Sequence, residues 1–461
     1  MVKENYNSDL YRTGDTSKYL KNFLYEGKFQ LQSGDILDKL NIAYETYGDL
    51  NEDRSNVVLV CHAISGDSHV AKHNEDDIPG WWDIMVGPDK PIDTNNYFVI
   101  CSNVIGGCKG STGPNSINPE TGNQYGPDFP NITVEEMVNA QNLLIDHLGI
   151  KSILCVTGGS MGGFQSIQWA RQFPNKIKSV IGLATSARLT NKALAFDIVG
   201  RNAIKKDPRF KEGNYYDAEE KPEDGLAIAR MLAHITYVSK DSMKNKFENT
   251  RYEPREITTE FEKRFSVGTY LAYQGTKFVD RFDANSYITL STAVDYFDLG
   301  GTINEIKNNL KKTTCEWLLV SFSSDWLYPP FQSEEIVDAL VSLDKSVSYC
   351  SIESEAGHDA FLLENEVEDY GLLTFPQIIE NSSNVGIIKI AKRIGTKRLY
   401  RTCRDFAFGM PTNISFAGES SGTLRHITNW SGFSIASVSM GQEVAVTTLQ
   451  MAMAYAAIAN G

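Results

Sequence analysis

The residues of this chain best suited to covalent chemistry are a serine set between glycines and, later in the sequence, an aspartate and a histidine. Ser160 is centred in 158–162 (GGSMG), which follows an apolar run at 153–156 and precedes a helix-like segment at 164–173. Flanking glycines let a strand and a helix pack closely around a strained turn. Such a pattern also occurs in purely structural turns, so a catalytic interpretation also requires a histidine and an acidic residue elsewhere in the chain. With partners it predicts a serine nucleophile, with the amide of Met161 directed at the developing oxyanion.

A histidine that serves as general base should follow the serine in the chain if the fold is that of the α/β-hydrolases. Of the three histidines after Ser160, His234 lies in helix-like sequence, where a packed or surface residue is the plainer interpretation. His426 lies in a C-terminal segment that looks foreign to this fold. His358 follows a strand-like run at 347–352 and is therefore the predicted base.

The acid of the predicted triad is Asp325, which comes directly after the strand-like run 317–321. Alone it could begin an Asx turn or cap a helix. Paired with a histidine at the end of the next strand, it would fix the tautomer of His358 and stabilise the imidazolium form. The second oxyanion donor is expected in the loop after the strand-like run 57–60, where the amide of Ile64 is the candidate.

Strand-like runs alternate with longer segments, which predicts an α/β fold with a doubly wound sheet. The runs are 57–60, 97–101, 153–156, 179–184, 317–321 and 347–352. A helix is predicted at 133–148, with a capping box of Thr133 and Glu136 at its start and Gly149 at its end. Long, charged, helix-like sequence at 188–310 interrupts the strand pattern and predicts a lid that excludes water from the site.

Composition narrows the class of function. Among 461 residues, 58 are acidic and 44 basic, so general binding to nucleic acid or to an anionic membrane is not expected. There is no apolar run long enough to span a membrane, and the polar N-terminus lacks a signal-peptide core, which predicts a cytoplasmic protein. The seven scattered cysteines fit reduced thiols. His62 and His69 suggest a metal, but no third ligand appears at a recognisable spacing, so no metal is expected.

The first 366 residues resemble the homoserine O-acetyltransferase family of the α/β-hydrolase superfamily. The matching stretches are 43–48 (AYETYG), 62–70 (HAISGDSHV), 103–114 (NVIGGCKGSTGP), 158–163 (GGSMGG), 234–237 (HITY), 324–326 (SDW) and 357–359 (GHD). The resemblance implies a ping-pong reaction in which acetyl-CoA acylates the serine and the hydroxyl of L-homoserine then takes the acetyl group. Acetyl-CoA would be a co-substrate, with no bound cofactor, and the protein would be a homodimer.

The resemblance also implies that Arg230 and Tyr237 contact homoserine and that Asp359 meets its amine. An amino acid presents a carboxylate and an ammonium, which call for a planar cation and a carboxylate. A serine esterase on the same fold, the main alternative, would need neither. A succinyl donor or a serine acceptor also stays open, because the acyl pocket cannot be read from one sequence.

After about residue 367 the chain resembles a different family, the transpeptidase domain of penicillin-binding proteins. The resembling stretches are 370–376 (YGLLTFP), 381–386 (NSSNVG), 408–412 (FGMPT), 417–419 (AGE), 437–442 (SVSMGQ) and 447–461. Residues 382–384 match the Ser-x-Asn motif of that family, whereas its Ser-x-x-Lys and Lys-Ser/Thr-Gly motifs have no counterpart. Transpeptidation and β-lactam binding are therefore not expected, and an accidental join is favoured over a protein with two activities.

Three parts are thus predicted along the chain. Residues 1–187 and 311–368 form an α/β-hydrolase core, residues 188–310 form a helical lid, and residues 369–461 are a partial transpeptidase-like fragment. A non-catalytic role in binding the cell wall through that fragment is the weakest of the three classes of function considered, after the acyltransferase and the esterase.

Overall fold

The structure, a computed structural model, describes residues 17–247, 265–363, 384–412, 420–430, 434–439, 441 and 444–459. It divides into two compact units. One comprises Met1–Lys345 and Ser351–Asn365, and the other comprises Ser346–Cys350 and Glu366–Gly461.

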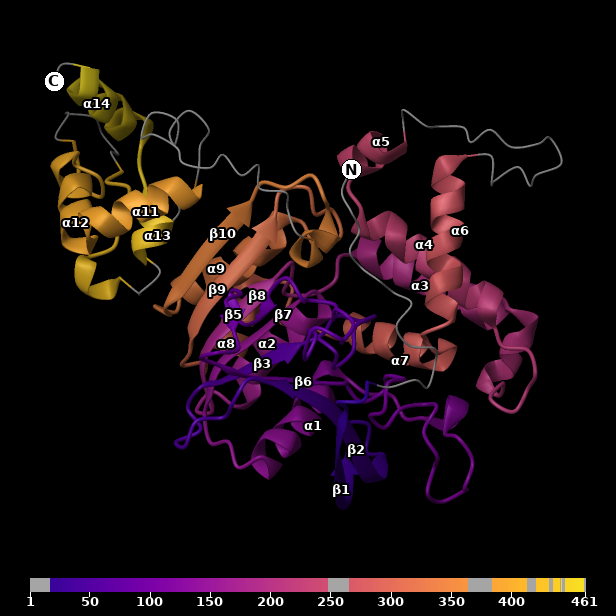
Figure 1. Cartoon of the computed structure of the whole chain (residues 1–461). Coiled ribbons are helices and arrows are strands. Elements are labelled where there is room, and N and C mark those ends of the chain that lie inside the picture. The colour runs from indigo at the N-terminus through magenta and orange to yellow at the C-terminus, as the bar shows by residue number, and fades with distance from the viewer. Residues whose placement is uncertain are drawn as a thin grey trace. The chain divides into compact units, whose positions relative to one another are not determined.

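The main sheet has eight strands, in the order β1-β2-β6-β3-β7-β8-β9-β10 (Figure 1). They are β1 (Lys21–Gln30), β2 (Ile36–Tyr47), β3 (Val57–Cys61), β6 (Phe98–Ser102), β7 (Ile153–Gly159), β8 (Ile177–Leu183), β9 (Glu316–Phe322) and β10 (Val347–Ile352). The pairs from β6 through β9 are parallel, and β1 and β2 join the sheet in antiparallel register. The six predicted strand runs are confirmed, and β1 and β2 are additional. Two short strands, β4 (Val86–Gly87) and β5 (Ile92–Asp93), form a separate pair.

Strand β1, one of the two strands of the main sheet that the sequence missed, differs from the central strands in burial. Every residue of β3 is buried, as expected for a strand covered on both faces. By contrast, most residues of β1 are exposed or half-buried, so polar and apolar side chains mix along it. A mixed strand of this kind gives no continuous apolar run, and its place at the edge is set by pairing with β2.

Helices flank the sheet. They include α1 (Val134–His147), α2 (Met161–Gln172), α8 (Ile303–Leu310) and α9 (Pro330–Val341). The predicted capping box is present at the start of α1, where the Glu136 carboxylate accepts the amide hydrogen of Thr133 at 2.6 Å. Met137 and Leu144 of α1 are fully buried, and α1 packs on α2. The helix that follows the serine is thereby held against the sheet.

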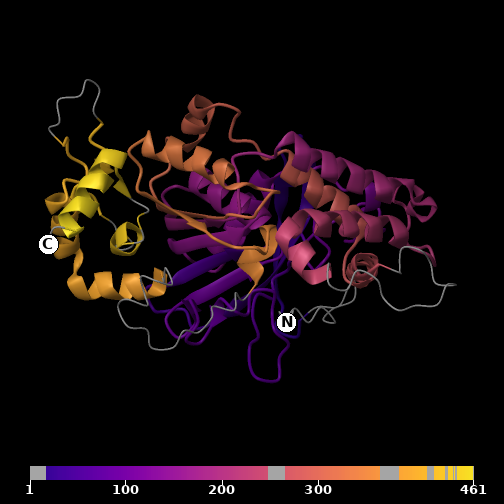
Figure 2. The same cartoon turned by 90° about the horizontal axis from the view of Figure 1, so that it is seen from above.

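Within the stretch predicted to be a lid, five helices form a group on one side of the sheet (Figures 1 and 2). They are α3 (Asn191–Lys206), α4 (Glu223–Tyr237), α5 (Lys240–Phe247), α6 (Ser266–Val279) and α7 (Ala284–Asp295). Helix α4 packs on both α3 and α6, and α3 also packs on α7. Helix α8 falls inside the same range of residues but contacts α9 and α2, so it belongs to the layers around the sheet.

The second unit contains four helices and a two-stranded sheet among its described residues. They are α11 (Asn384–Ile394), α12 (Thr396–Asp405), β11 (Thr423–Leu424), α13 (Ser434–Ser439), β12 (Val444–Ala445) and α14 (Thr448–Ala459). The side-chain amide of the buried Gln450 donates to the carbonyls of Met410 at 2.7 Å and Ser421 at 2.8 Å, which holds α14 to the preceding loops. Ser382 and Ser383 of the predicted Ser-x-Asn motif lie outside the described residues. None of the described helices is both long and apolar enough to cross a membrane.

Candidate active site

Ser160 lies at the turn between β7 and α2 in a conformation that side-chain-bearing residues rarely adopt. Its φ is 56° and its ψ is −123°. Such a residue stores strain of about 1–3 kcal/mol, which the surrounding structure must offset. A Cβ at Gly162 would lie 2.1 Å from the carbonyl oxygen of Cys61, and one at Gly158 would lie 2.5 Å from the same atom. The glycines are therefore needed because the turn passes directly over the end of β3.

Asp325 and His358 form a buried pair at the ends of β9 and β10. Oδ2 of Asp325 lies 2.8 Å from Nδ1 of His358, and the two residues are 3% and 2% exposed. The other carboxylate oxygen accepts the amide hydrogens of Leu327 at 3.0 Å and Tyr328 at 2.9 Å. With both oxygens engaged, the carboxylate fixes the orientation of the imidazole.

The charge state of His358 follows from its surroundings. Burial lowers its pKa, but the charge and hydrogen bond of Asp325, with the charge of Asp359, together raise it by more, so the pKa lies above the ordinary value of 6.5. Nε2 of the ring is buried and has no hydrogen-bond partner among the described residues. An acceptor nitrogen in this state can take a proton from a hydroxyl brought to it.

A pocket opens over the serine. It is lined by Ile64, Ser160, Met161, Ala193, Phe196, Asp197, Ala229, Leu232, Ala233, Thr236, Tyr237, Tyr287, Val294, Leu327 and Tyr328. Its floor brings Ser160 together with Ile64 and Met161, the two predicted oxyanion donors. Met161 is the first residue of α2, where a backbone amide has no acceptor inside the helix. Helices α3, α4 and α7 supply most of the opposite wall.

Two of the residues expected to recognise the substrate lie along α4. The guanidinium carbon of Arg230 is 4.7 Å from the ring centre of Phe278 and 5.7 Å from that of Tyr237. The Tyr237 ring is in turn 5.8 Å from the ring of His358. Tyr237 lines the pocket, whereas Arg230 and the half-buried Asp359 are not among the lining residues described. The structure thus brings Arg230 and Tyr237 together and connects them to the imidazole.

The C-terminal end of α4 is joined to the loop that carries the histidine. Val238 and Gly357 form an antiparallel bridge, and the indole nitrogen of Trp326 donates to the Val238 carbonyl at 3.0 Å. The Ser239 hydroxyl donates to the carbonyl of Glu355. Two segments more than a hundred residues apart in the chain are therefore held in one register beside the triad.

A carboxyl group that the sequence analysis did not single out also lines the pocket. Asp197 of α3 shares a hydrogen bond with Asp295 of α7, which is ion-paired with Arg201. Burial raises the pKa of Asp197 well above its ordinary value, and the nearby charge of Asp295 adds to the increase. The acid–base spacing of Asp197 and Arg201, one helical turn apart, is the signal that could have drawn attention to it.

The remaining histidines take different roles. His234 is packed in α4, and burial together with the charge of Arg230 lowers its pKa to about 2, in line with its interpretation as a packed residue. His62 uses both ring nitrogens within its own loops: Nδ1 lies 2.8 Å from the Ala63 carbonyl, and Nε2 accepts the Val104 amide hydrogen at 3.1 Å. His69 adjoins Glu45 and His73, two side chains of metal-ligating type that the sequence analysis did not connect with it.

Comparisons with known proteins agree with this geometry. A family model for the alpha/beta hydrolase fold matches residues 56–365, and a model for the penicillin binding protein transpeptidase domain matches residues 355–461. A homoserine O-acetyltransferase of Methanohalobium evestigatum is 53% identical over 346 residues, which is 75% of this chain and 70% of that protein. The chain belongs to the homoserine O-acetyltransferase family. The predicted family and the α/β-hydrolase fold are both confirmed.

Other relatives of the family differ in length and in activity. A bifunctional methionine biosynthesis protein MetXA/MetW of Rhodopirellula baltica is 52% identical over 368 residues, or 79% of this chain, and the match spans only 59% of that protein. Among solved structures, homoserine O-acetyltransferase from Bacillus anthracis matches with a TM-score of 0.68 and 29% identity, over 74% of this chain and 93% of that one. Esterase E22 matches equally well, with a TM-score of 0.68 and 27% identity, over 76% of this chain and 97% of that one. The shape of the fold therefore does not separate transfer from hydrolysis.

Proposed function

We propose that this protein is a homoserine O-acetyltransferase that moves the acetyl group of acetyl-CoA to the hydroxyl of L-homoserine through an acyl-serine intermediate. The observation that carries the proposal is the buried Asp325–His358 pair, with its 2.8 Å contact, in the segments after β9 and β10, together with a strained Ser160 after β7. Parallel strands present such ends at one edge of a sheet. Membership of the family supports the identity of the acceptor, and Ser160 is among the residues that line the pocket.

In the first half-reaction, Ser160 attacks the thioester carbonyl while Nε2 of His358 takes the hydroxyl proton. The oxyanion of the tetrahedral intermediate accepts hydrogen bonds from the amides of Met161 and Ile64. The C–S bond then breaks, and the sulfur leaves as free CoA with the proton returned by His358. Asp325 stabilises the imidazolium form of His358 that exists between the uptake and the return of the proton.

In the second half-reaction, the homoserine hydroxyl occupies the position left by CoA. His358 removes its proton, the oxygen attacks the acyl-serine, and collapse of the second tetrahedral intermediate returns the proton to Ser160. Water would give acetate at the same step, so the yield of transfer depends on how well the wall formed by α3, α4 and α7 excludes it.

Recognition of the acceptor is assigned to Arg230, Tyr237 and Asp359. The arginine supplies a planar, bidentate donor for the carboxylate, and Asp359 accepts the ammonium. Support for the first two residues comes from α4, where Arg230 lies next to the ring of Tyr237. Tyr237 in turn lines the pocket and lies close to the imidazole of His358. An esterase acting on an uncharged ester gains nothing from these charges, and for that reason transfer is favoured over the activity of esterase E22.

The proposal is tested by mixing purified protein with acetyl-CoA and following free thiol with and without L-homoserine. Homoserine-dependent thiol release, with O-acetylhomoserine detected by mass spectrometry, is expected. Release that is equally fast without an acceptor would indicate hydrolysis and would reject the transferase. Replacing acetyl-CoA with succinyl-CoA, and homoserine with serine, tests the donor and the acceptor in the same assay.

Two further parts of the proposal come from the family alone, namely acetyl rather than succinyl as donor group and assembly as a homodimer, whereas a cytoplasmic location is expected from the free, scattered cysteines. The donor is decided by the ratio of rates with the two thioesters. Assembly is decided by the mass of the untagged protein in solution, measured by light scattering after size-exclusion chromatography.

A further inference from the structure

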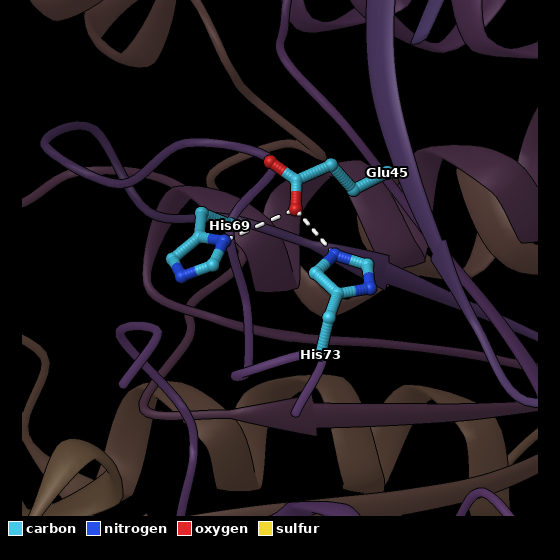
Figure 3. A group of neighbouring side chains, drawn as sticks. All are labelled: Glu45, His69 and His73. Carbon is cyan, nitrogen blue, oxygen red and sulfur yellow. Dashed lines mark hydrogen bonds and ion pairs between the residues drawn. The ribbon is translucent and has the colours of Figure 1, made fainter. Parts of the chain in front are cut away.

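A buried cluster of metal-ligating side chains lies away from the catalytic triad. Glu45 projects from β2, and His69 and His73 lie in the loop after β3 (Figure 3). Oε2 of Glu45 is 3.0 Å from Nδ1 of His69 and 2.8 Å from Nε2 of His73. The three ligand atoms all lie within 4.8 Å of one another. The side chains of Glu45, His69 and His73 are only 1%, 4% and 14% exposed, so the three atoms meet in a part of the molecule that is largely closed to solvent.

The surroundings of His69 orient one ring nitrogen toward the carboxylate. Its Nε2 lies 2.7 Å from the carbonyl oxygen of Ile78, so this nitrogen carries a hydrogen that it donates. Nδ1 then faces Oε2 of Glu45, and without a metal a proton on Nδ1 completes an ion pair with that carboxylate, so a cation would take the place of this proton. Two acceptors 3.0 Å apart repel unless a proton or a cation lies between them. A carbonyl contact on the far nitrogen is also the usual support for a histidine that binds metal.

Neighbouring aromatic side chains fix the positions of the other two candidate ligands, His73 and Glu45. The ring of His73 is stacked between Tyr19 and Tyr47, with ring centres 4.0 Å and 4.3 Å away. The Tyr47 hydroxyl donates to Oε2 of Glu45 at 3.0 Å. Stacking on both faces leaves His73 able to move mainly within its own plane, with Nε2 directed at the carboxylate. The cluster is therefore ordered before any ligand arrives.

We propose that Glu45, His69 and His73 bind a divalent transition-metal cation of the zinc class. Two imidazole nitrogens and one carboxylate oxygen form a donor set that Zn²⁺ takes in proteins, with the fourth position left to water. Tetrahedral bonds of about 2.1 Å place donors about 3.4 Å apart. From the observed 2.8 Å and 3.0 Å, each histidine has to move away from Glu45 by about half an ångström, and the two histidine nitrogens, which lie within 4.8 Å of each other, have to reach the same spacing; rotation of the side chains supplies these movements.

The cation would join the sheet to the loop that lines the catalytic pocket. Glu45 belongs to β2, whereas His69 and His73 continue the loop that contains Ile64. The part of this loop between Ile64 and His69 is already held by a hydrogen bond, because the carbonyl of Asp67 accepts the indole hydrogen of Trp81 at 2.8 Å. A bound cation adds a link at the far end of this loop. Its role is therefore to hold the loop, and it takes no part in the transfer chemistry.

The test is direct binding to the full-length, untagged protein after treatment with a chelator. Titration with ZnSO₄ in a calorimeter is expected to give one equivalent per chain. Co²⁺ in its place is expected to give visible d–d absorption bands of the intensity typical of four-coordinate sites. Both signals should weaken at least about tenfold in affinity in His73→Gln, which loses one ligand at the most exposed of the three positions.

His147→Gln is the matched control, because this exposed histidine is stacked on Phe23 and lies outside the cluster. It should bind Zn²⁺ as the unaltered protein does. Glu45→Gln provides a second variant, and thermal unfolding without metal establishes that each variant is folded. Failure of the unaltered protein to bind Zn²⁺ would overturn the proposal and leave a protonated His69 paired with Glu45. Equal affinity in the folded His73→Gln and Glu45→Gln variants would overturn it as well.

Discussion

The region at 17–363 and the region at 384–459 bury very different side chains. In the first, whole aromatic residues such as Trp82, Trp169 and Phe164 are fully buried. In the second, the buried apolar residues among those described are Ala391, Leu424, Val438 and Ala454, and α12 buries none. Burial of a large apolar side chain contributes about 1.5–3 kcal/mol to the free energy of unfolding. The first region therefore gains enough stability from burial to offset a strained serine and a buried ion pair, whereas the described residues of the second gain far less.

The contrast extends to the site. All the contacts described for Ser160, Asp325 and His358 are made by residues of the first region. The match to the transpeptidase domain, by comparison, covers 355–461 and begins within the loop of the catalytic histidine. Chemistry is therefore assigned to the first region, and four experiments test that assignment.

Ser160→Ala gives the largest expected effect. Without the hydroxyl, acetyl-CoA has no nucleophile to acylate, so both CoA release and homoserine acetylation should fall at least about a thousandfold. Stopped assays of thiol release measure the rate, and intact-mass measurement detects the acyl-enzyme. A variant that still gains 42 Da (about the mass of one acetyl group) with acetyl-CoA would refute the role of Ser160. Thermal unfolding serves as the control for folding.

Asp325→Asn should cost less than Ser160→Ala, with a loss of up to about ten-thousandfold in kcat, because the imidazole loses its orienting partner and its charge stabilisation but remains in place. The dependence on pH sharpens the test. The base must be neutral, and the Asp325 carboxylate holds the pKa of His358 above 6.5 despite burial. Removing that charge lowers the pKa, so the acid limb of kcat/KM should move to lower pH. An unchanged acid limb would assign the titration to another group.

Arg230→Lys separates the two half-reactions. Lysine keeps the charge but loses the bidentate fork, so KM for homoserine should rise roughly ten- to a hundredfold while acylation by acetyl-CoA stays unchanged. Arg209→Lys is the matched control, since this arginine makes a two-point contact with the buried Asp207 and is not among the residues that line the pocket. Equal loss in both half-reactions would show that Arg230 supports the fold of α4 instead of recognising the acceptor.

Removal of residues 369–461 should have the smallest effect. If the chemistry resides in the first region, kcat and KM should stay as they are in the full chain, and loss of a weakly packed segment should improve solubility. Limited proteolysis is expected to leave an active fragment that ends near residue 368. Loss of activity on trimming would mean that the C-terminal segment stabilises the loop of His358, and the contrast between the regions would fail.

The pairing of Asp325 with His358 was predictable because both residues come shortly after apolar strands, as Ser160 does. Ser160, Asp325 and His358 lie at the ends of β7, β9 and in the loop after β10, and parallel strands bring such ends to one edge. Glycines around Ser160 further restricted the local backbone. The fold class was predictable for the same reason, since the buried strands are continuous apolar runs.

Other features depend on contacts that no local pattern records. Glu45 and His69 are 24 residues apart and meet only because β2 pairs with β6 in antiparallel register and the loop after β3 folds beside it. Asp197 reaches the pocket through the packing of α3 on α7. Side chains assembled in this way need the tertiary structure, because their spacing in the sequence is arbitrary.

The bridge between Val238 and Gly357 has a consequence for motion. Helix α4 is attached at its C-terminal end to the segment that presents the imidazole, so a displacement of that end would also displace His358. Any movement of α4 that leaves His358 in place therefore has to keep this end of the helix fixed. The wall of the pocket formed by α4 and the position of the imidazole are thus mechanically coupled at this one point of attachment.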